Sequence, residues 1–247
     1  MSSSHSSHRQ PLLLKRLAPE EVASHLARDP RLIVPVGTTE QHGPHLPLGC
    51  DTLIVERLAD DLSAEFRVLR APTIEYGVNA PTASPFPGAA SIRRKTLHRL
   101  LNDLLGSWEE GGVEQFVILS AHGHEPHQEA LSTVRPRHAS VRTVDIFALP
   151  IETQQGSTLP IHGGEVDTSM LLYIDARLVN LSRARDFAPS RREIRRYRRG
   201  SRRALPSESG GALGRPSLAT AEKGRELYEL IYERIALRVM LDGSRDE

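Results

Sequence analysis

The sequence predicts an α/β protein built on a mostly parallel sheet. Short apolar runs alternate with segments in which apolar residues recur every three or four positions, the pattern of strands that alternate with amphipathic helices. The run at 115–120 is almost wholly apolar, as expected for a strand buried on both faces of a parallel sheet. Parallel neighbours need crossover connections, and the intervening helices supply them.

The elements follow one another in a regular order. The expected strands are short apolar runs at 31–36, 66–71, 115–120 and 141–149. The expected helices carry an apolar stripe and lie at 19–28, from Asp51 onward, at 96–110, at 126–135, from Asp167 onward and at 220–241. Paired glycines end the helix at 96–110, and the long helix at 220–241 closes the domain.

Bulk properties favour one globular domain. The chain has 247 residues, of which 38% are hydrophobic, and its net charge of +1 gives no reason to expect a nucleic acid or a membrane surface as partner. We expect a mobile tail at 1–12 and a single domain at 13–242. The tail has no apolar core typical of a secretory signal, and no apolar run is long enough to span a membrane. A cytoplasmic location is therefore expected.

The most informative segment is 34–51. It places Glu40, His42, His45 and Asp51 within twelve residues, directly behind the apolar run of the first strand. Carboxylate and imidazole groups at this spacing suit zinc, manganese or a similar divalent ion. The alternative is a polar loop that happens to hold two histidines. Cys50, the single cysteine, is either a nucleophile, a soft ligand or a small buried filler, and the hard donors around it favour the filler.

Two further polar clusters follow strands or open helices. His122, His124 and Glu125 stand where the strand at 115–120 ends, and His162, Glu165 and Asp167 open a later helix. Ligands of open parallel sheets bind at the carboxyl ends of the strands, so we expect the first two clusters to meet at one edge. The alternative for the third cluster is helix capping, which we favour for Thr168 and Ser169.

Two other segments stand out by composition. The stretch 76–88 is broken by prolines and glycines, and a loop of that length inside a compact domain is usually functional. The segment 191–203 contains eight arginines. It has little aromatic interleaving and no recognised nucleic-acid motif, which favours a solvated segment or a subunit contact over nucleic-acid binding.

The residues at 36–51, Val36-Gly-Thr-Thr-Glu-Gln-His-Gly-Pro-His-Leu-Pro-Leu-Gly-Cys-Asp51, resemble the signature of the creatininase (creatinine amidohydrolase) family. Tyr76-Gly77, Phe86-Pro-Gly88, His122-Gly123 and the segment 162–169 follow in the same order as in that family. The resemblance spans about 30–235. It implies a three-layer α/β/α sandwich with a mostly parallel sheet, commonly assembled as a homo-oligomeric hexamer.

The resemblance also implies a ligand set for two divalent ions, zinc or manganese, with iron as a further option. Glu40, Asp51 and His122 would hold one ion, and His42 together with Asp51 the other. The last ligand of the second ion is Glu165, with His124 as the alternative. The two ions would share both Asp51 and a water molecule, and this water would attack the substrate carbonyl.

The resemblance assigns His162 and Asp167 to catalysis, with His162 protonating the departing nitrogen. It assigns Tyr76, Gly88 and His124 to substrate binding. The chain departs from the family pattern at 120–125, at 82–85, at Ala89 and at Asp167, where the family usually has glutamate; all of these would line the substrate pocket. The hydrolytic residues are therefore expected to be intact, whereas creatinine itself is a doubtful substrate.

We therefore expect a metal-dependent amidohydrolase that cleaves a non-peptide C–N bond, in a cyclic amide or a formamide, of a small molecule. Two alternatives remain. One is a peptidase that trims a precursor peptide during cofactor or natural-product maturation. The other is a non-catalytic member of the family that acts as a binding or scaffold protein.

Overall fold

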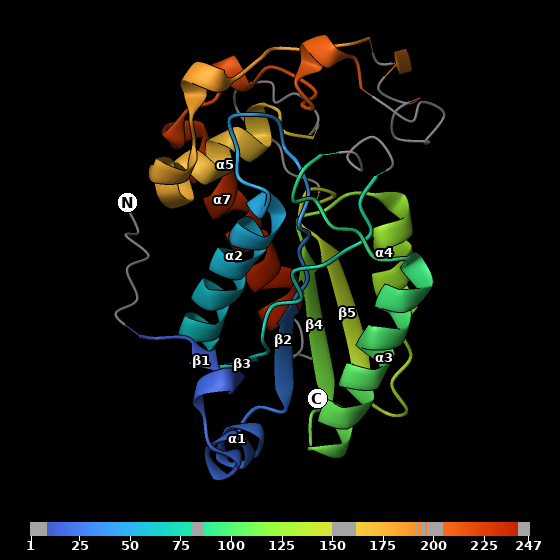
Figure 1. Ribbon diagram of the computed structural model, residues 1–247. Helices are drawn as coiled ribbons and strands as arrows, with labels where there is room; N and C mark the ends of the chain where they lie inside the picture. Colours follow the sequence, from blue (N-terminus) through green and yellow to red (C-terminus); the bar gives the residue numbers. More distant parts are fainter. Residues whose placement is uncertain are drawn as a thin grey trace.

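The structure, a computed structural model, describes residues 9–80, 86–149, 162–190, 192–193, 196 and 205–241. Its core is a five-stranded sheet with the order β1-β3-β2-β4-β5, in which every neighbouring pair is parallel (Figure 1). The strands are β1 (Leu12–Leu13), β2 (Arg31–Pro35), β3 (Leu69–Arg70), β4 (Gln115–Ser120) and β5 (Ser140–Asp145). The predicted parallel α/β sheet is confirmed.

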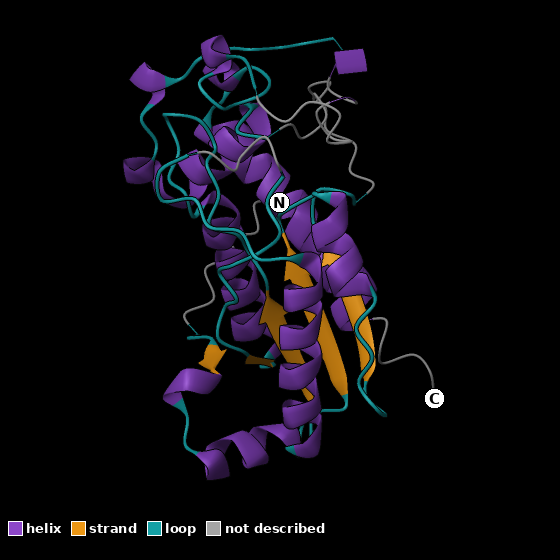
Figure 2. Ribbon diagram, turned by 45° about the vertical axis from the view of Figure 1, so that its right-hand side comes forward, coloured by secondary structure: helices purple, strands orange, loops and turns teal. Residues whose placement is uncertain are grey.

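Helices cover both faces of this sheet, giving three layers (Figures 1 and 2). The α-helices are α1 (Pro19–Leu26), α2 (Cys50–Phe66), α3 (Arg94–Glu110), α4 (Glu125–Ser132), α5 (Glu165–Asp175) and α7 (Ala221–Ile235). Helices α2, α5 and α7 pack on one face, and α3 and α4 on the other. Short 3₁₀ turns are η1 (Leu14–Arg16), η3 (Ala176–Leu178), η4 (Leu181–Arg183), η5 (Ser207–Ser209) and η6 (Pro216–Leu218).

Strand β4, which lies between β2 and β5, contributes to two separate apolar clusters, one on each face of the sheet. Val117 and Leu119 belong to the apolar cluster formed with α2, α5 and α7, whereas Phe116 and Ile118 belong to the cluster formed with α3 and α4. All four side chains are fully buried. Alternate residues of a strand point to opposite faces, so an apolar run of this length is explained by helices on both sides.

The ends of several elements differ from the sequence prediction. Leu12, placed in the tail by the sequence, pairs with Leu69 of β3, so the domain begins before residue 13; residues 1–8 of the predicted tail lie outside the described ranges. Strand β5 ends at Asp145 rather than at 149, because the Asp145 side chain and carbonyl accept the N–H groups of Phe147 and Ala148 in a turn. The last helix is α-helical only to Ile235 and continues as the π-helix η7 (Ala236–Leu241).

The register of the sheet sets where the site can form. Pro35 of β2 lies opposite Leu119 of β4, and Ser120 lies opposite Asp145 of β5. The segments that follow these strands therefore leave the sheet at the same edge, the upper one in Figure 1. Across the described ranges, we find no helix with the length and apolar character needed to cross a membrane.

The contact between α5 and α7 yields a first prediction. A Cβ atom on Gly224 of α7 would overlap the carbonyl oxygen of Ser169 in α5. Gly224→Ala should therefore force the helices apart and destabilise the protein by about 1–3 kcal/mol, measured by urea unfolding. Gly106→Ala in α3 is the matched control, since no described residue outside its own stretch of helix lies within 4 Å of its Cβ position, and it should stabilise by roughly 0.5–1 kcal/mol. Equal midpoints for both variants would contradict the close packing.

Candidate metal centre and active site

Four of the predicted ligands meet at the carboxyl edge of the sheet. Glu40 and His42 lie in the segment that follows β2, and His122 lies two residues after β4. Asp51 lies in the first turn of α2, whose N-terminus faces the same edge. All four side chains are buried, none more than 7% exposed. The order of strands thus assembles residues that lie up to 82 positions apart in the sequence.

Asp51 is the centre of this group. Its Oδ1 lies 3.1 Å from His42 Nε2, and its Oδ2 lies 2.9 Å from His122 Nδ1. His122 Nδ1 also lies 3.3 Å from Glu40 Oε2. The ligand atoms of Glu40, Asp51 and His122 lie within 4.8 Å of one another. Each Asp51 oxygen faces a different histidine, an arrangement in which one carboxylate could serve two ions.

Both histidines are held from behind by backbone carbonyl groups. His42 Nδ1 lies 3.1 Å from the Glu40 carbonyl oxygen, and His122 Nε2 lies 3.1 Å from the Val78 carbonyl oxygen. A carbonyl oxygen only accepts, so these ring nitrogens donate, and His42 Nε2 and His122 Nδ1 are the ones turned toward the carboxylates. Metal-binding histidines in proteins are oriented by the same kind of contact.

The charges in this group are strongly coupled. Burial lowers the pKa of His42, but the Asp51 carboxylate outweighs burial and raises it to about 10. Burial likewise lowers the pKa of His122, and Glu40 and Asp51 raise it to about 9. Burial would raise the pKa of Asp51, yet the two histidines hold it well below its usual range. Protons on the histidines thus neutralise the carboxylates, a task that a divalent cation would perform equally well.

A test of fit comes from Glu40. Its Oε2 is buried and forms no hydrogen bond with the described residues, and its contact at 3.3 Å with His122 Nδ1 is an ion pair alone. Burial is also the largest cause of a raised pKa for this carboxyl group. A buried, unsatisfied carboxylate oxygen is costly, and a cation would satisfy it. The donor set of carboxylates and imidazoles therefore fits a divalent metal.

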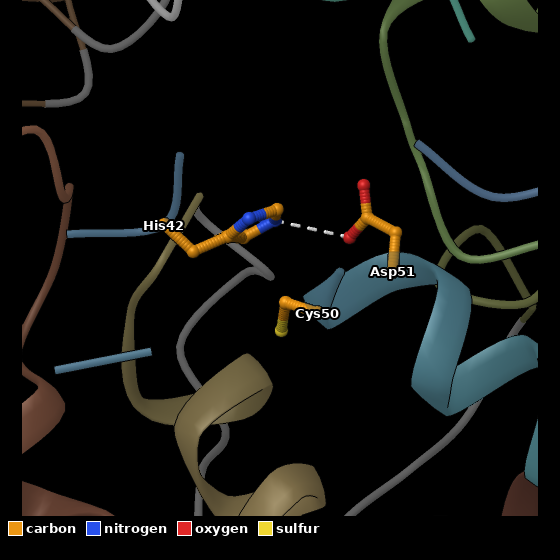
Figure 3. A group of neighbouring side chains, drawn as sticks. All are labelled: His42, Cys50 and Asp51. Atoms are coloured by element: carbon orange, nitrogen blue, oxygen red, sulfur yellow. Dashed lines mark hydrogen bonds and ion pairs between the residues drawn. The ribbon is translucent and has the colours of Figure 1, made fainter. Parts of the chain in front are cut away.

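Cys50 lies beside this group but is not directed into it. Its Sγ is within 4.8 Å of ligand atoms of His42 and Asp51. Figure 3 shows the sulfur pointing away from the contact between those two residues. Cys50 is fully buried within the apolar core, and burial raises the pKa of its thiol well above the usual range. Both facts favour the filler role that the sequence suggested.

The two predicted catalytic residues also lie here. The His162 ring lies beside that of His42, tilted by 36° with centroids 4.4 Å apart, and its Nδ1 lies 3.8 Å from Glu40 Oε1. Asp167 is buried, and its Oδ2 accepts the Gly163 N–H at 2.7 Å. Burial raises the pKa of Asp167 to about 6. His162 therefore reaches the group of ligands, whereas the hydrogen bond of Asp167 holds the loop that carries His162.

The structure does not bring Glu165 or His124 into either candidate ligand group. Glu165 Oε1 accepts from Lys223 Nζ of α7 at 2.6 Å. His124 Nδ1 donates to the Val78 carbonyl oxygen at 2.9 Å, and its ring centroid lies 6.0 Å from that of His122. The choice between these two residues as the last ligand of a second ion stays a prediction.

The metal content of two variants decides that choice. Lys223 neutralises Glu165, and a metal ion that recruits Glu165 must replace this contact. If Glu165 completes the second site, Glu165→Gln should lose one ion per chain by elemental analysis, while His124→Ala keeps two. The reverse result would assign the position to His124.

The predicted substrate residues lie farther from the ligands. Tyr76 is 53% exposed, in the segment that follows β3. Gly88 adopts a φ of +83° and packs against Leu48, because a Cβ atom there would lie 2.7 Å from Leu48 Cδ1. Residues 81–85, which stand just before Phe86-Pro-Gly88, lie outside the described ranges, as does most of the arginine-rich segment 191–203.

Several supporting residues were missed by the sequence reasoning. Thr38 donates its hydroxyl to Asp51 Oδ2 at 2.7 Å, and Gln41 contacts His162. His127 is fully buried, and its Nδ1 accepts the N–H of Val78, whose carbonyl orients His122. The position of Gln41 inside the 34–51 segment was an available signal. The contribution of Val78 was not visible, because every residue carries a carbonyl group.

The fold and the site together define an α/β protein with a candidate divalent-metal centre at the carboxyl edge of a parallel sheet. A family model described as "Creatinine amidohydrolase" matches residues 15–239. The chain belongs to this family, the creatininase family. It is therefore an enzyme, since the members of this family are amidohydrolases.

Individual relatives agree with this assignment. The chain is 31% identical to a mycofactocin precursor peptide peptidase of Mycolicibacterium smegmatis, over 85% of this chain and 84% of that protein. It is 25% identical to a creatinine amidohydrolase of Pseudomonas putida, over 90% of this chain and 91% of that protein. A crystal structure of creatininase shares the fold, with a TM-score of 0.74 and 22% identity over 94% of this chain and 98% of that chain.

Proposed function

We propose that this protein hydrolyses a C–N bond of a small-molecule amide, with divalent metal held by Glu40, His42, Asp51 and His122. The observation that carries the proposal is the buried group itself, in which two carboxylates and two oriented imidazoles converge. Creatininase structures of a Zn–Zn type and with Mn have been described, which supports zinc or manganese as the metal. Two ions per chain is the stoichiometry that we propose.

The chain's own residues have separable tasks in this proposal. A bound divalent ion lowers the pKa of water toward neutrality and polarises a carbonyl group. Asp51 fixes the spacing of the ligands, since each of its oxygens faces a different histidine. Thr38 holds the Asp51 carboxylate in place through its hydroxyl. His162 presents a ring nitrogen on the side of Glu40, where the reacting carbonyl would lie.

The depth of the site favours a compact substrate. The four proposed ligands are at most 7% exposed, whereas the His162 side chain is 22% exposed. Because His162 is the most exposed residue of this group, we propose that a scissile bond passes His162 to reach the ligands. A small amide or a chain end can do so, but the middle of an extended peptide would have to bring two flanking chains into the same buried space. We therefore propose a small cyclic amide or formamide as the substrate class.

A second candidate function is peptide trimming. Relatives named as mycofactocin precursor peptide peptidases are more similar in sequence to this chain than the creatinine amidohydrolase of Pseudomonas putida is. In that case the burial of the ligands favours cleavage near a peptide end. A third possibility, a scaffold without activity, has no use for four converging buried ligands, which argues against it.

A substrate panel tests these functions. Protein loaded with zinc or manganese should hydrolyse at least one member of a set of lactams, cyclic ureides, formamides and short peptides, measured by release of the amine. Metal-free protein and Asp51→Asn are the negative controls. Turnover of small amides supports the first candidate, and turnover of peptides alone supports the second. No metal-dependent turnover across a broad panel would support the scaffold.

A further inference from the structure

Gln41 lies between two proposed metal ligands, and its side chain is almost fully buried, at 4% exposed. Its amide group makes three contacts. Oε1 accepts the N–H of Gly43 at 2.9 Å, and Nε2 donates to the Gly211 carbonyl oxygen at 2.7 Å. Nε2 also lies 2.9 Å from His162 Nε2. No metal-binding role is assigned to this residue, so its contacts call for another explanation.

The two backbone contacts fix the orientation of the amide. A backbone N–H only donates and a carbonyl oxygen only accepts, so turning the amide over would break both hydrogen bonds. Gly211 permits this close approach, because a Cβ atom there would overlap Gln41 Oε1. The nitrogen of the amide must therefore face Gly211, and its second N–H is the one directed at His162.

The orientation of the amide fixes the proton on the His162 ring. Because Gln41 presents an N–H to Nε2, that ring nitrogen must carry a lone pair, and the ring proton must be on Nδ1. Nδ1 is the nitrogen on the side of Glu40, 3.8 Å from Oε1. The contact with Gln41 thus selects which atom of His162 is presented to the ligand group.

We propose that Gln41 is a positioning residue that holds His162 with its proton on Nδ1, so that the ring faces the metal centre as a hydrogen-bond donor. The catalytic meaning of this donor rests on the proposed function, whereas the tautomer itself does not. While Gln41 keeps its orientation, Nε2 has no acceptor for a second ring proton. His162 then assists by donating a hydrogen bond to developing charge, as a neutral histidine can. This differs from the acid role expected from the sequence.

The test is the tautomer of His162, observed by two-bond ¹H–¹⁵N correlation in uniformly labelled protein, both metal-free and loaded with zinc. His162→Ala identifies its signals by their loss. In the wild type, Nδ1 should be protonated and Nε2 should not. In Gln41→Glu, the carboxyl group holds at most one proton where the amide holds two, so it cannot donate to both Gly211 and His162. The proton of His162 should therefore appear on Nε2.

Two further variants complete the design. Gln41→Leu removes the donor without adding an acceptor, and it should leave His162 as a mixture of both tautomers. Gln115→Glu introduces the same chemical change at the opposite end of β4, and its His162 signals should match the wild type. The wild-type spectrum and Gln41→Leu still test the proposal where Gln41→Glu does not fold.

Two results would overturn the proposal. One is a wild-type His162 protonated on Nε2, and the other is a folded Gln41→Glu with unchanged His162 signals. Zinc content and amide hydrolysis, measured on the same samples, test the proposed function separately from the positioning role of Gln41. If the protein neither bound zinc nor hydrolysed amides, but His162 carried its proton on Nδ1, the proposed function would be wrong and the positioning role of Gln41 would be supported.

Discussion

Asp51→Ala is expected to release most of the bound metal. Each oxygen of this carboxylate faces a different histidine, so one substitution removes a ligand from both proposed ion positions. His42→Ala should cost only one position and therefore about half of the metal. Elemental analysis of protein purified without chelator, with metal added back at defined concentration, measures both losses. Activity should vanish together with the metal in Asp51→Ala.

The control must separate lost ligation from lost folding. Asp51→Asn keeps the size of the side chain and one oxygen but removes the charge, so it should also bind little metal while its fold remains. Asp61→Asn, on the same helix α2, removes a carboxylate that accepts from Tyr228 and Arg57. It should keep the full metal complement. A folded Asp51→Ala with wild-type metal content would rule out the proposed centre.

The centre of the fold could be predicted from the sequence, and its margins could not. Strand β4 has the ends that the sequence predicts. Its four middle residues are apolar, as expected for a strand that is covered on both faces. The helix α3 is predicted by apolar residues that recur every three or four positions. Of these, Leu97, Leu101 and Leu105 are fully buried, whereas Leu100 is 38% exposed. Such periodic signals come from burial against a whole layer, so they survive local variation.

The errors occur where pairing rather than periodicity decides. Strand β1 is two residues long and exists only because Leu12 and Leu13 pair with β3. No local sequence pattern predicts a strand of two residues. Strand β5 ends at Asp145 because the side chain and the carbonyl oxygen of Asp145 accept the N–H groups of Phe147 and Ala148 in a turn. The residues after Asp145 are apolar, so the sequence pattern predicts a longer strand.

The site divides in the same way. Glu40, Asp51 and His122 could be predicted as neighbours, since each belongs to a segment at the carboxyl edge of the sheet. The contact between Glu165 and Lys223 could not be predicted, because Lys223 lies 58 residues away and meets Glu165 only through the tertiary packing of α7. The orientation of His122 by Val78, and of His162 by Gln41, likewise depends on backbone and amide contacts that carry no signature in the sequence.

His162→Ala is expected to keep the metal and lose roughly 10²–10³-fold in kcat, the range typical of removing one hydrogen-bond donor to developing charge. The reason is its place: the ring lies beside His42 and 3.8 Å from Glu40, yet it belongs to neither candidate ligand group. Removing it should spare the ligands while removing the donor that we propose to face the reacting bond. Turnover and elemental analysis of the same preparation measure the two effects separately.

The nature of the substrate sharpens this test of His162. The loss in kcat should shrink for an activated anilide, whose departing nitrogen needs less help, and stay large for an unactivated amide. His138→Ala, at an exposed position between α4 and β5, is the matched control and should leave kcat and metal content unchanged. If the ring only supports its loop, His162→Ala should instead lose stability and metal together. Near-normal turnover of an unactivated amide by a metal-loaded His162→Ala would exclude a catalytic role for His162, because a donor that faces the reacting bond cannot be removed without raising the barrier.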